Sequence, residues 1–555
     1  MKMNWKRISA CAIGAFFCLA GMFASVNEKG IDYYRAELYV AAELYFESQI
    51  PSLQGTDLAE AYYYMGECYA ATNKLDKAEE YYQKAIQANS EYPYSYIGQG
   101  KLALLNKNVK AANDLFKKAI GYAKKDPAIH TSVAEAYIDA KQYTEAEDVL
   151  DKARSIKKNF SGIYVAEGDM LMAQEKLGDA AARYENAIVF DPNDKVAYLK
   201  EARVYKAINP DMALEILNRL IAVDPNYIPA YAELGETYYK KNNYTKAIEA
   251  YNRFINIHGV PEKHQVIYAS LLFFTKDYMK SLEEINKVLS VEPNNLVMRR
   301  LQIYNNYELE NYQLGLELSE KFIQSTKKDD LIAQDYTYYG RLLDKSKNTI
   351  GAIEAYNKAL SLDNSKTDVY KDLAEAYERN ENYAEAIKNY QFFIENDKNA
   401  TLMDVFNFGR TCYNAGNQAT VTGDALAQKT PEELAADSLQ RRDFLLKADS
   451  VFAQVEERSP DSYLGVFWRA RTNTSLDPDS KLGLAKPFYE AAAAKLEAAS
   501  ESASRNRNLI ECYRYMLAYY YLVMEDNATT KIFCNKILEI DPENELAQQI
   551  LAAIK

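Results

Sequence analysis

The residue types that carry most enzyme chemistry are scarce in this sequence. Only 3 histidines, 6 cysteines and 2 tryptophans occur among 555 residues. His130 lies in an apolar stretch that we expect to be a helix core, and His258 and His264, which we place in a loop, have no cysteine nearby to complete a zinc site. A phosphate-binding glycine-rich loop and a nucleophile elbow are also absent. We therefore predict a non-enzymatic protein with no catalytic residue, no metal and no cofactor.

Long hydrophobic runs are absent except at the N-terminus. There, a short basic segment at residues 2–7 precedes an apolar run from Ile8 to about Val26. This order predicts a signal peptide over residues 1–25, and an uncleaved membrane anchor is the alternative. Both interpretations place the remaining chain in the periplasm or cell envelope of a bacterium, with membrane contact only through this segment if it is uncleaved.

An excess of positive charge is absent as well. The formal net charge is −13, and it becomes −16 if the three cations of the leader are removed with it. An acidic body argues against general binding to nucleic acid or to anionic membranes. Solubility is a sufficient explanation for this charge, so the charge identifies no partner by itself.

What the sequence does contain is a repeat near 34 residues. Small residues recur at this spacing in the second half of each repeat, at Ala78, Ala112, Ala146, Ala180, Ala213, Ala247, Ser281 and Gly315. Others recur in the first half, at Gly66, Gly100, Ala134, Gly168, Ala202, Gly235, Gly340 and Ala374. Apolar residues around them follow the period of a helix face. Each repeat is therefore predicted to be two antiparallel helices, with small residues where the helices meet.

Two repeats show the pattern most fully. One has Tyr164, Gly168, Ala180, Tyr184, Ala187 and Pro192, and another has Tyr231, Leu234, Gly235, Tyr238, Ala247 and Tyr251. This pattern resembles the tetratricopeptide repeat family, whose signature is W-x2-L-G-x2-Y, then A-x3-F-x2-A, then proline. Tyrosine replaces the aromatic residues of the signature, in keeping with 47 tyrosines in the chain. The resemblance covers most of the chain and implies an all-α, right-handed superhelical solenoid of about 12–13 helix-turn-helix repeats.

The repeat also divides the chain into parts. Residues 26–57 are expected to form an N-terminal capping helix, and residues 58–397 a regular array. Residues 398–542 are predicted to be degenerate repeats, and residues 543–555 a C-terminal capping helix.

An insertion at residues 417–439 interrupts one degenerate repeat. Within it, Thr430-Pro431-Glu432-Glu433 has the capping-box spacing of a helix start. We interpret the insertion as a surface loop followed by an extended helix. Such a segment either binds a partner or is a tolerated surface insertion, and we favour the second interpretation.

Four cysteines lie outside the leader, and their spacing matches no metal motif. Cys512 and Cys534 are predicted on the two helices of one repeat. They would lie close enough for a disulfide in an oxidising compartment, although buried free thiols are the interpretation that we favour.

In the family that the chain resembles, ligands usually bind in a concave groove lined by the first helices. The resemblance implies that Tyr63, Tyr64 and Glu67, beside the packing positions of the first repeat, face a partner. Members that bind chaperone tails carry asparagine directly after the first-helix glycine, whereas Glu67, Lys101 and Glu236 occupy that position here. Binding to such chaperone tails is therefore not expected.

A second group of groove residues is predicted in the degenerate repeats. One predicted groove position is occupied by Phe406, Phe467 and Tyr515. The position four residues later is occupied by Arg410, Arg471 and Tyr519, and Trp468 lies beside these residues. Aromatic residues and arginine dominate binding hot spots, and arginine can hold a carboxylate through two hydrogen bonds. The alternative is that the register differs here and that these residues belong to the core.

Three functions remain in view. The first is a protein–protein interaction scaffold or assembly factor in the bacterial cell envelope, which binds an extended protein or peptide segment in its groove. The second is a binding module for envelope polysaccharide or peptidoglycan, because tyrosine and tryptophan faces can stack on sugar rings. The third is an enzyme with a site in the insertion or the degenerate repeats, which the lack of a catalytic constellation argues against.

Overall fold

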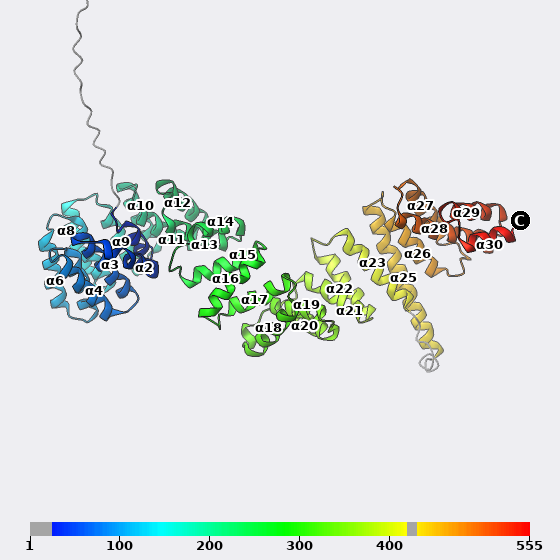
Figure 1. Cartoon of the computed structure of the whole chain (residues 1–555), viewed down its shortest axis with the longest axis horizontal. Helices are drawn as coiled ribbons and strands as arrows, with labels where there is room; N and C mark the ends of the chain where they lie inside the picture. The colour runs from blue at the N-terminus through cyan, green and yellow to red at the C-terminus, as the bar shows by residue number, and fades with distance from the viewer. Residues whose placement is uncertain (1–24, 419–429, 555) are drawn as a thin grey trace, which may run out of the picture. The chain divides into compact units, whose positions relative to one another are not determined.

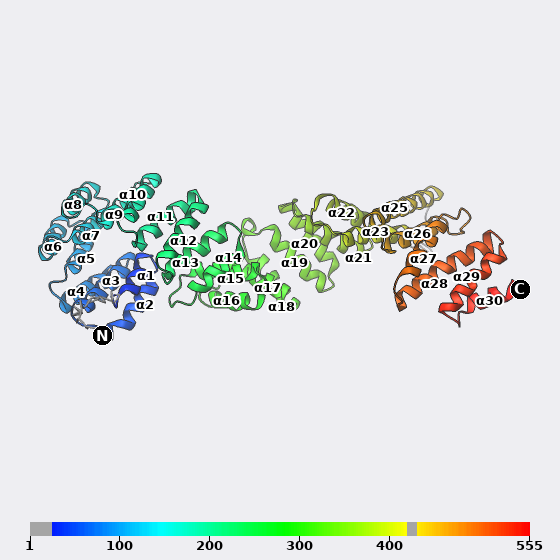
Figure 2. The same cartoon turned by 90° about the horizontal axis from the view of Figure 1, so that it is seen from above.

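The computed structural model describes residues 25–418 and 430–554, and over these ranges the regular structure is entirely helical. The expected leader up to residue 24 and the insertion loop at residues 419–429 lie outside the described residues. None of the helices that are described is long and apolar enough to span a membrane. The chain divides into two compact units, which we call the N-terminal unit (Met1–Leu301) and the C-terminal unit (Gln302–Lys555) (Figures 1 and 2).

The helices have the following bounds. In the N-terminal unit they are α1 (Glu28–Arg35), α2 (Tyr39–Gln49), η1 (Ile50–Ser52), α3 (Gly55–Ala71), α4 (Leu75–Ala88), α5 (Pro93–Leu105), α6 (Val109–Tyr122), α7 (Pro127–Asp139), α8 (Tyr143–Ile156), α9 (Ser161–Ala173), α10 (Leu177–Phe190), α11 (Lys195–Ile208), α12 (Pro210–Val223), α13 (Ile228–Lys240), α14 (Tyr244–Phe254), α15 (Glu262–Phe274) and α16 (Tyr278–Val291). Helix α17 (Leu296–Glu308) contains the division between the units. In the C-terminal unit they are α18 (Tyr312–Ser325), η2 (Lys328–Asp330), α19 (Ala333–Lys345), α20 (Thr349–Leu362), α21 (Thr367–Arg379), α22 (Tyr383–Asn396), α23 (Leu402–Asn417), α25 (Pro431–Arg458), α26 (Leu464–Leu476), α27 (Lys486–Ala498), α28 (Ala503–Ala518), the π-helical turn η3 (Tyr519–Val523), α29 (Asn527–Ile540) and α30 (Glu545–Ala553).

From α3 to α29, the described helices pair into thirteen two-helix repeats. The all-α repeat architecture predicted from the sequence is therefore confirmed. In several successive repeats the first helices contact one another, whereas consecutive second helices in the described ranges make few contacts or none. The first helices therefore line one side of each unit, which we call the inner face.

The turn inside nine of the thirteen described repeats is a Schellman motif. In the first repeat, the Lys74 N–H donates to the Tyr69 carbonyl at 2.8 Å, and the Asn73 N–H donates to the Ala70 carbonyl at 3.0 Å. Asn73 has a φ of 58°, and the same left-handed conformation recurs at Lys107, Lys141, Glu175, Asn242, Lys276, Glu310, Lys347 and Glu381. Each of these non-glycine residues costs about 1 kcal/mol of backbone strain, which the two flanking helices hold in place.

An aromatic ring of the second helix packs directly against the small residue of the first helix. A Cβ atom added at Gly168 would lie 2.4 Å from the ring of Tyr184, which is buried. The same contact joins Gly66 to Tyr82, Gly100 to Phe116, Gly235 to Tyr251, Gly340 to Tyr356 and Gly409 to Phe452. The recurrent small residues are thus packing residues, because a larger side chain would displace a buried ring.

The N-terminal cap differs from the single helix predicted over residues 26–57. Two helices, α1 and α2, lie against the inner face of the N-terminal unit. Lys195 of α11 pairs with Asp32 of α1 at 2.7 Å. Arg203, also on α11, pairs with Glu37 at 2.8 Å and donates to the Ala36 carbonyl at 2.8 Å. These contacts join segments more than 160 residues apart, which no repeat pattern records.

Helix α2 adds apolar contacts at both ends of the same unit. The Phe46 ring is fully buried and stacks on the Tyr64 ring of α3, with 5.9 Å between the ring centroids. A Cβ atom added at Gly259, in the turn before α15, would lie 2.9 Å from the Ala41 backbone nitrogen. The pair α1–α2 therefore bridges the first repeat to repeats near the end of the N-terminal unit.

Two segments of the C-terminal unit are helical where the sequence led us to expect helices. Helix α25 is extended to 28 residues and begins with the capping box at Thr430. Helix α30 forms the final helix expected over residues 543–555.

We predict that Gly168→Ala destabilises the protein by about 1–3 kcal/mol, because the new methyl group would overlap the Tyr184 ring. Urea denaturation followed by circular dichroism measures this loss. Gly178→Ala in α10 is the matched control, since its Cβ would meet nothing within 4 Å. The control should be neutral or up to about 1 kcal/mol more stable. Equal effects of the two changes would contradict the packing role.

We predict that Phe46→Ala releases α1–α2 from the inner face while the repeats stay folded. Removing a fully buried phenylalanine costs about 3–5 kcal/mol. Hydrogen exchange should therefore accelerate across residues 28–49 and stay slow in the repeat helices. Leu44→Ala on the same helix is the control, because Leu44 is 42% exposed. Slow exchange of residues 28–49 in the Phe46 variant would show that the pair is held by other contacts.

Candidate functional site

One residue in each first helix marks the inner face: the residue directly after the small packing residue. We call this set the inner row. In the N-terminal unit it contains Glu67, Lys101, Glu135, Asp169, Arg203 and Glu236, and in the C-terminal unit it contains Arg341, Glu375, Arg410 and Arg471. The row alternates in sign along much of its length, so its members can pair with one another or with neighbouring helices.

In the N-terminal unit, the pair α1–α2 covers the start of the inner row. Glu67 accepts hydrogen bonds from Tyr34 of α1 at 2.9 Å, Tyr82 at 2.6 Å and Lys101 at 3.2 Å. Tyr63, Tyr64 and Glu67 are all less than 10% exposed. The expectation that these three residues face an open groove is therefore wrong. Helices α1 and α2 pack over Tyr64 and Glu67, whereas Tyr63 packs against Tyr82, Tyr92 and Tyr94.

The remaining members of this row are largely paired within the N-terminal unit. Asp169 pairs with Lys200 at 2.7 Å, and Glu236 pairs with Lys206 at 3.1 Å. Glu135 is partly buried and interacts electrostatically with Arg35 of α1. Burial and the carboxylate of Asp169 raise the pKa of Glu135 to about 7, against the opposing charges of Arg35 and Lys200.

In the C-terminal unit, the structure brings several of the predicted groove residues together around Trp468. The rings of Phe406, Tyr413 and Phe452 lie 5.4–5.6 Å from the Trp468 ring. The Arg471 guanidinium lies 5.0 Å from the same ring. Arg471 also donates to both carboxylate oxygens of Glu511, at 2.7 and 2.6 Å. This cluster is packed and internally paired.

Three other predicted groove residues have different positions. Phe467 is 2% exposed and belongs to the core, so its placement in the groove is wrong. The register is one residue away there, and Trp468 takes the partly exposed position. Tyr515 stacks between Tyr489 and Tyr519, with ring centroids 4.6 and 6.4 Å apart, and is partly buried.

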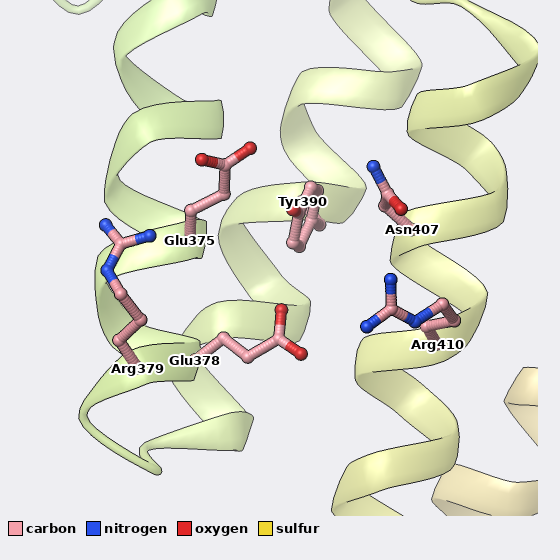
Figure 3. A pocket seen from close by; sticks show the side chains of 6 residues that line it. All are labelled: Glu375, Glu378, Arg379, Tyr390, Asn407 and Arg410. Carbon is pink, nitrogen blue, oxygen red and sulfur yellow. The ribbon is translucent and has the colours of Figure 1, made fainter.

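Arg410 lies in a cleft of about 210 Å³ between α21 and α23. Figure 3 shows Glu375, Glu378 and Arg379 extending from α21, Asn407 and Arg410 from α23, and Tyr390 of α22 between them. Arg379 pairs with Asp344, and Glu378 accepts hydrogen bonds from Thr411 and Asn414. Glu375 and Arg410 make no ion pair with any residue in the described ranges, although both belong to the inner row.

The Tyr390 hydroxyl is another group at this cleft that has no partner in the described ranges. The Tyr390 side chain is 2% exposed, yet its hydroxyl makes no hydrogen bond within the part of the chain that the structure describes. In two other repeats the corresponding tyrosine bonds to the inner-row residue 15 positions earlier, as Tyr82 does to Glu67 and Tyr184 does to Asp169. The equivalent pair here is Tyr390 and Glu375, and this bond is not formed.

The electrostatics of the cleft follow from its burial. Desolvation and the nearby Asp372 raise the pKa of Glu375, against the attraction of Lys371 and Arg379. Desolvation, with Glu375 and Glu378 close by, raises the pKa of Tyr390, so the phenol keeps its proton at neutral pH. The cleft thus presents an incompletely compensated carboxylate at its wall and a free guanidinium at its rim.

The sequence identified Arg410 but missed Glu375, Glu378, Tyr390 and Asn407. Two signals were available: Glu375 occupies the inner row one repeat before Arg410, and Tyr390 lies 15 residues after Glu375. Neither signal shows whether the carboxylate of Glu375 is paired, because the cation that would pair with it comes from a neighbouring helix.

Histidine and cysteine form no chemical site in the described ranges. His130 is buried as expected, whereas His264 lies on α15 rather than in a loop and accepts or donates a hydrogen bond with Tyr251 at 3.0 Å. No group of histidine, cysteine and carboxylate residues there could hold a metal ion. Cys512 and Cys534 are free and buried, and desolvation raises the pKa of both thiols.

Comparison with known proteins identifies the repeat. Tetratricopeptide repeat models match residues 59–92, 103–164 and 228–257. The chain belongs to the tetratricopeptide repeat family. Proteins built from this repeat are protein-interaction scaffolds.

The similar proteins share the repeat rather than the whole chain. Tetratricopeptide repeat protein 1 of Schizosaccharomyces pombe is 25% identical over 47% of this chain and 26% of its own length. A TPR repeat-containing protein of Methanocaldococcus jannaschii is 24% identical over 51% of this chain and 52% of its own. The chain thus spans only about a quarter to a half of these two relatives.

Among solved structures, the C-terminal part of a TPR repeat-containing protein from Cytophaga hutchinsonii is 26% identical. It covers 52% of this chain and 99% of that chain, with a TM-score of 0.40. A tetratricopeptide repeat protein from Parabacteroides merdae is 17% identical, covers 45% and 98%, and has a TM-score of 0.29. Because both scores are low, the family assignment rests on the repeat itself.

We predict that Glu135 makes the stability of the N-terminal unit pH-dependent. Its pKa of about 7 in the folded protein exceeds the ordinary value of 4.5, so folding binds a proton between these values. Stability contributed by the protonated form is full below about pH 4.5 and is lost as the pH rises through 7. Urea denaturation at pH 5 and pH 8 should show a larger loss for the natural protein than for Glu135→Gln. Parallel changes in both proteins would contradict this.

Proposed function

We propose that this protein is a non-enzymatic interaction scaffold or assembly factor of the bacterial cell envelope. It holds an extended segment of a partner protein on the inner face of the C-terminal unit. The binding site is the cleft between α21 and α23, which Glu375, Glu378, Arg379, Tyr390, Asn407 and Arg410 line. The observation that carries the proposal is this open cleft, with an unpaired guanidinium at its rim.

The cleft is suited to a protein chain by size and by chemistry. A volume of about 210 Å³ admits a few side chains of an extended segment rather than a folded domain. Arg410 and Asn407 can donate to backbone carbonyls or carboxylates, and Glu375 can accept from amides or cations. The walls are helices, so the site is formed before binding and little receptor ordering is needed.

Other parts of the inner row are already covered or paired within the protein, and this supports the cleft as the binding site. In the N-terminal unit, α1 and α2 already occupy the inner face and satisfy Glu67 and Arg203. A partner would have to displace them and their buried Phe46 contact. At the Trp468 cluster, Arg471 is held by Glu511 through two hydrogen bonds. At the cleft, Arg410 forms no ion pair with a described residue, so a partner can bind it without breaking one.

The polysaccharide hypothesis receives no comparable support. A sugar ring needs a free aromatic face, and the Trp468 ring is surrounded by Phe406, Tyr413, Phe452 and the Arg471 guanidinium. Tyr515 is likewise stacked on both neighbours. Placement in the envelope rests on the basic and apolar N-terminal segment of the sequence.

We predict that Arg410→Glu abolishes recovery of the partner in a pulldown from bacterial envelope extract, because reversing this charge repels a bound carboxylate or carbonyl. Arg514→Glu is the matched control, since Arg514 is exposed in the same unit and lies outside the cleft. Circular dichroism of both variants confirms that the helices remain. A cytoplasmic extract is processed in parallel.

Each outcome bears on a different part of the proposal. Equal recovery of one protein by both variants would contradict the cleft as its site. Recovery of the partner only from the cytoplasmic extract would contradict the envelope location. Failure to recover any protein, together with capture of envelope glycan, would replace the scaffold proposal with the polysaccharide one.

A further inference from the structure

The inner row provides a comparison that points to the chemistry of the bound segment. In each of two other repeats, the ring of the second helix presents its hydroxyl to the inner-row carboxylate, as Tyr82 does to Glu67 at 2.6 Å and Tyr184 does to Asp169 at 2.8 Å. A cation completes both sites: Lys101 lies 3.2 Å from Glu67, and Lys200 lies 2.7 Å from Asp169. Tyrosine, carboxylate and lysine thus form a recurrent three-residue arrangement.

At the cleft, the first two members of this arrangement are present and the cation is missing. Tyr390 and Glu375 stand in the same register as Tyr184 and Asp169. In the first repeat the lysine, Lys101, comes from the inner row of the next first helix, one residue after its glycine. The corresponding residue on α23 is Arg410, and it forms no ion pair with Glu375 or with any other described residue.

The nearby cations do not replace the missing one. Arg379 pairs with Asp344. Lys371 pairs with Asp404 at 2.6 Å, and Arg341 pairs with Asp372 at 2.7 Å. Glu375 therefore remains a partly buried carboxylate with open hydrogen-bond capacity, and the Tyr390 hydroxyl beside it makes no hydrogen bond to a described residue. Both groups line the same cleft (Figure 3).

We propose that the cleft takes the basic side chain of a lysine or arginine from the partner segment, with its cation on Glu375 and Tyr390, while Arg410 pairs with a carboxylate of the same segment. This inference rests on the proposed function and specifies its partner. The cation restores the arrangement found at Glu67 and Asp169. It also converts a desolvated carboxylate into a charge-assisted pair, which is the stronger class of hydrogen bond.

The recognition element is consequently a segment that carries both charges close together. Glu375 on α21 and Arg410 on α23 stand on opposite walls of the cleft, so the basic and acidic side chains of the segment separate across it (Figure 3). A segment with only acidic side chains would bring a carboxylate against Glu375 and Glu378. The arrangement therefore discriminates by repulsion as well as by attraction.

The test is selection of phage-displayed random 12-residue peptides on the immobilised protein, followed by titration of the synthetic consensus peptide. We expect lysine or arginine at one fixed position and aspartate or glutamate nearby. Glu375→Gln should weaken binding of this peptide by about 10-fold or more, since it removes a charged hydrogen-bond acceptor. Tyr390→Phe should weaken it by a smaller factor of about 2–10.

Two controls separate the contact from a general loss of charge or fold. Glu354→Gln on α20 removes the same charge from an exposed position outside the cleft and should leave affinity unchanged. Replacing the basic residue of the peptide by norleucine should weaken binding to the natural protein but not to Glu375→Gln, because the two changes remove the same interaction.

The outcomes distinguish this inference from the proposed function. A consensus without a basic residue, or a peptide whose affinity is unaffected by Glu375→Gln, would overturn the inference and leave peptide binding intact. Recovery of no peptide above a blank surface would overturn both. Selection of acidic peptides by Glu375→Lys, in place of basic ones, would give the strongest support.

Discussion

The contact between a second-helix ring and the small residue of the first helix sets the separation of the two helices in many of the repeats. Its consequences reach the inner face. Where the ring is tyrosine, its hydroxyl emerges beside the inner-row residue, as at Tyr82 and Glu67 or Tyr184 and Asp169. Where it is phenylalanine, as at Phe116 and Phe452, the same packing carries no polar group. A requirement of core packing thus decides where the inner face has a hydroxyl to offer.

Whether such a hydroxyl and carboxylate remain open depends on the neighbouring helices. In the N-terminal unit, lysines from adjacent first helices and side chains of α1 satisfy them. At Tyr390 and Glu375 the local cations are engaged by Asp344, Asp404 and Asp372 instead. Carboxylates without a cation are costly in a partly buried site. Glu375 in the cleft accordingly has no compensating cation, and this is the physical basis for proposing a binding site there.

The sequence predicted local patterns and missed contacts between segments that are far apart along the chain. The period, the packing residues, the capping box at Thr430 and the final helix were available because each is a local pattern. Arg410 and Arg471 share one row of the repeat by the same reasoning. The position of α1–α2 was not available, since its partners Lys195 and Arg203 lie far along the chain. The docked pair α1–α2 explains why Tyr64 and Glu67 are covered. Phe467 was placed in the groove together with Trp468 although it is buried, because a shift of one residue exchanges core for surface on a helix.

The docking of α1–α2 also fixes an order of events in folding. Contacts within and between successive repeats join residues close in sequence and can form as each helix pair is completed. The ion pairs of α1 join residues 163 and 166 positions apart, from Asp32 to Lys195 and from Glu37 to Arg203. They require α11, so α1 can reach its final place only after a helix more than 160 residues further along the chain has formed.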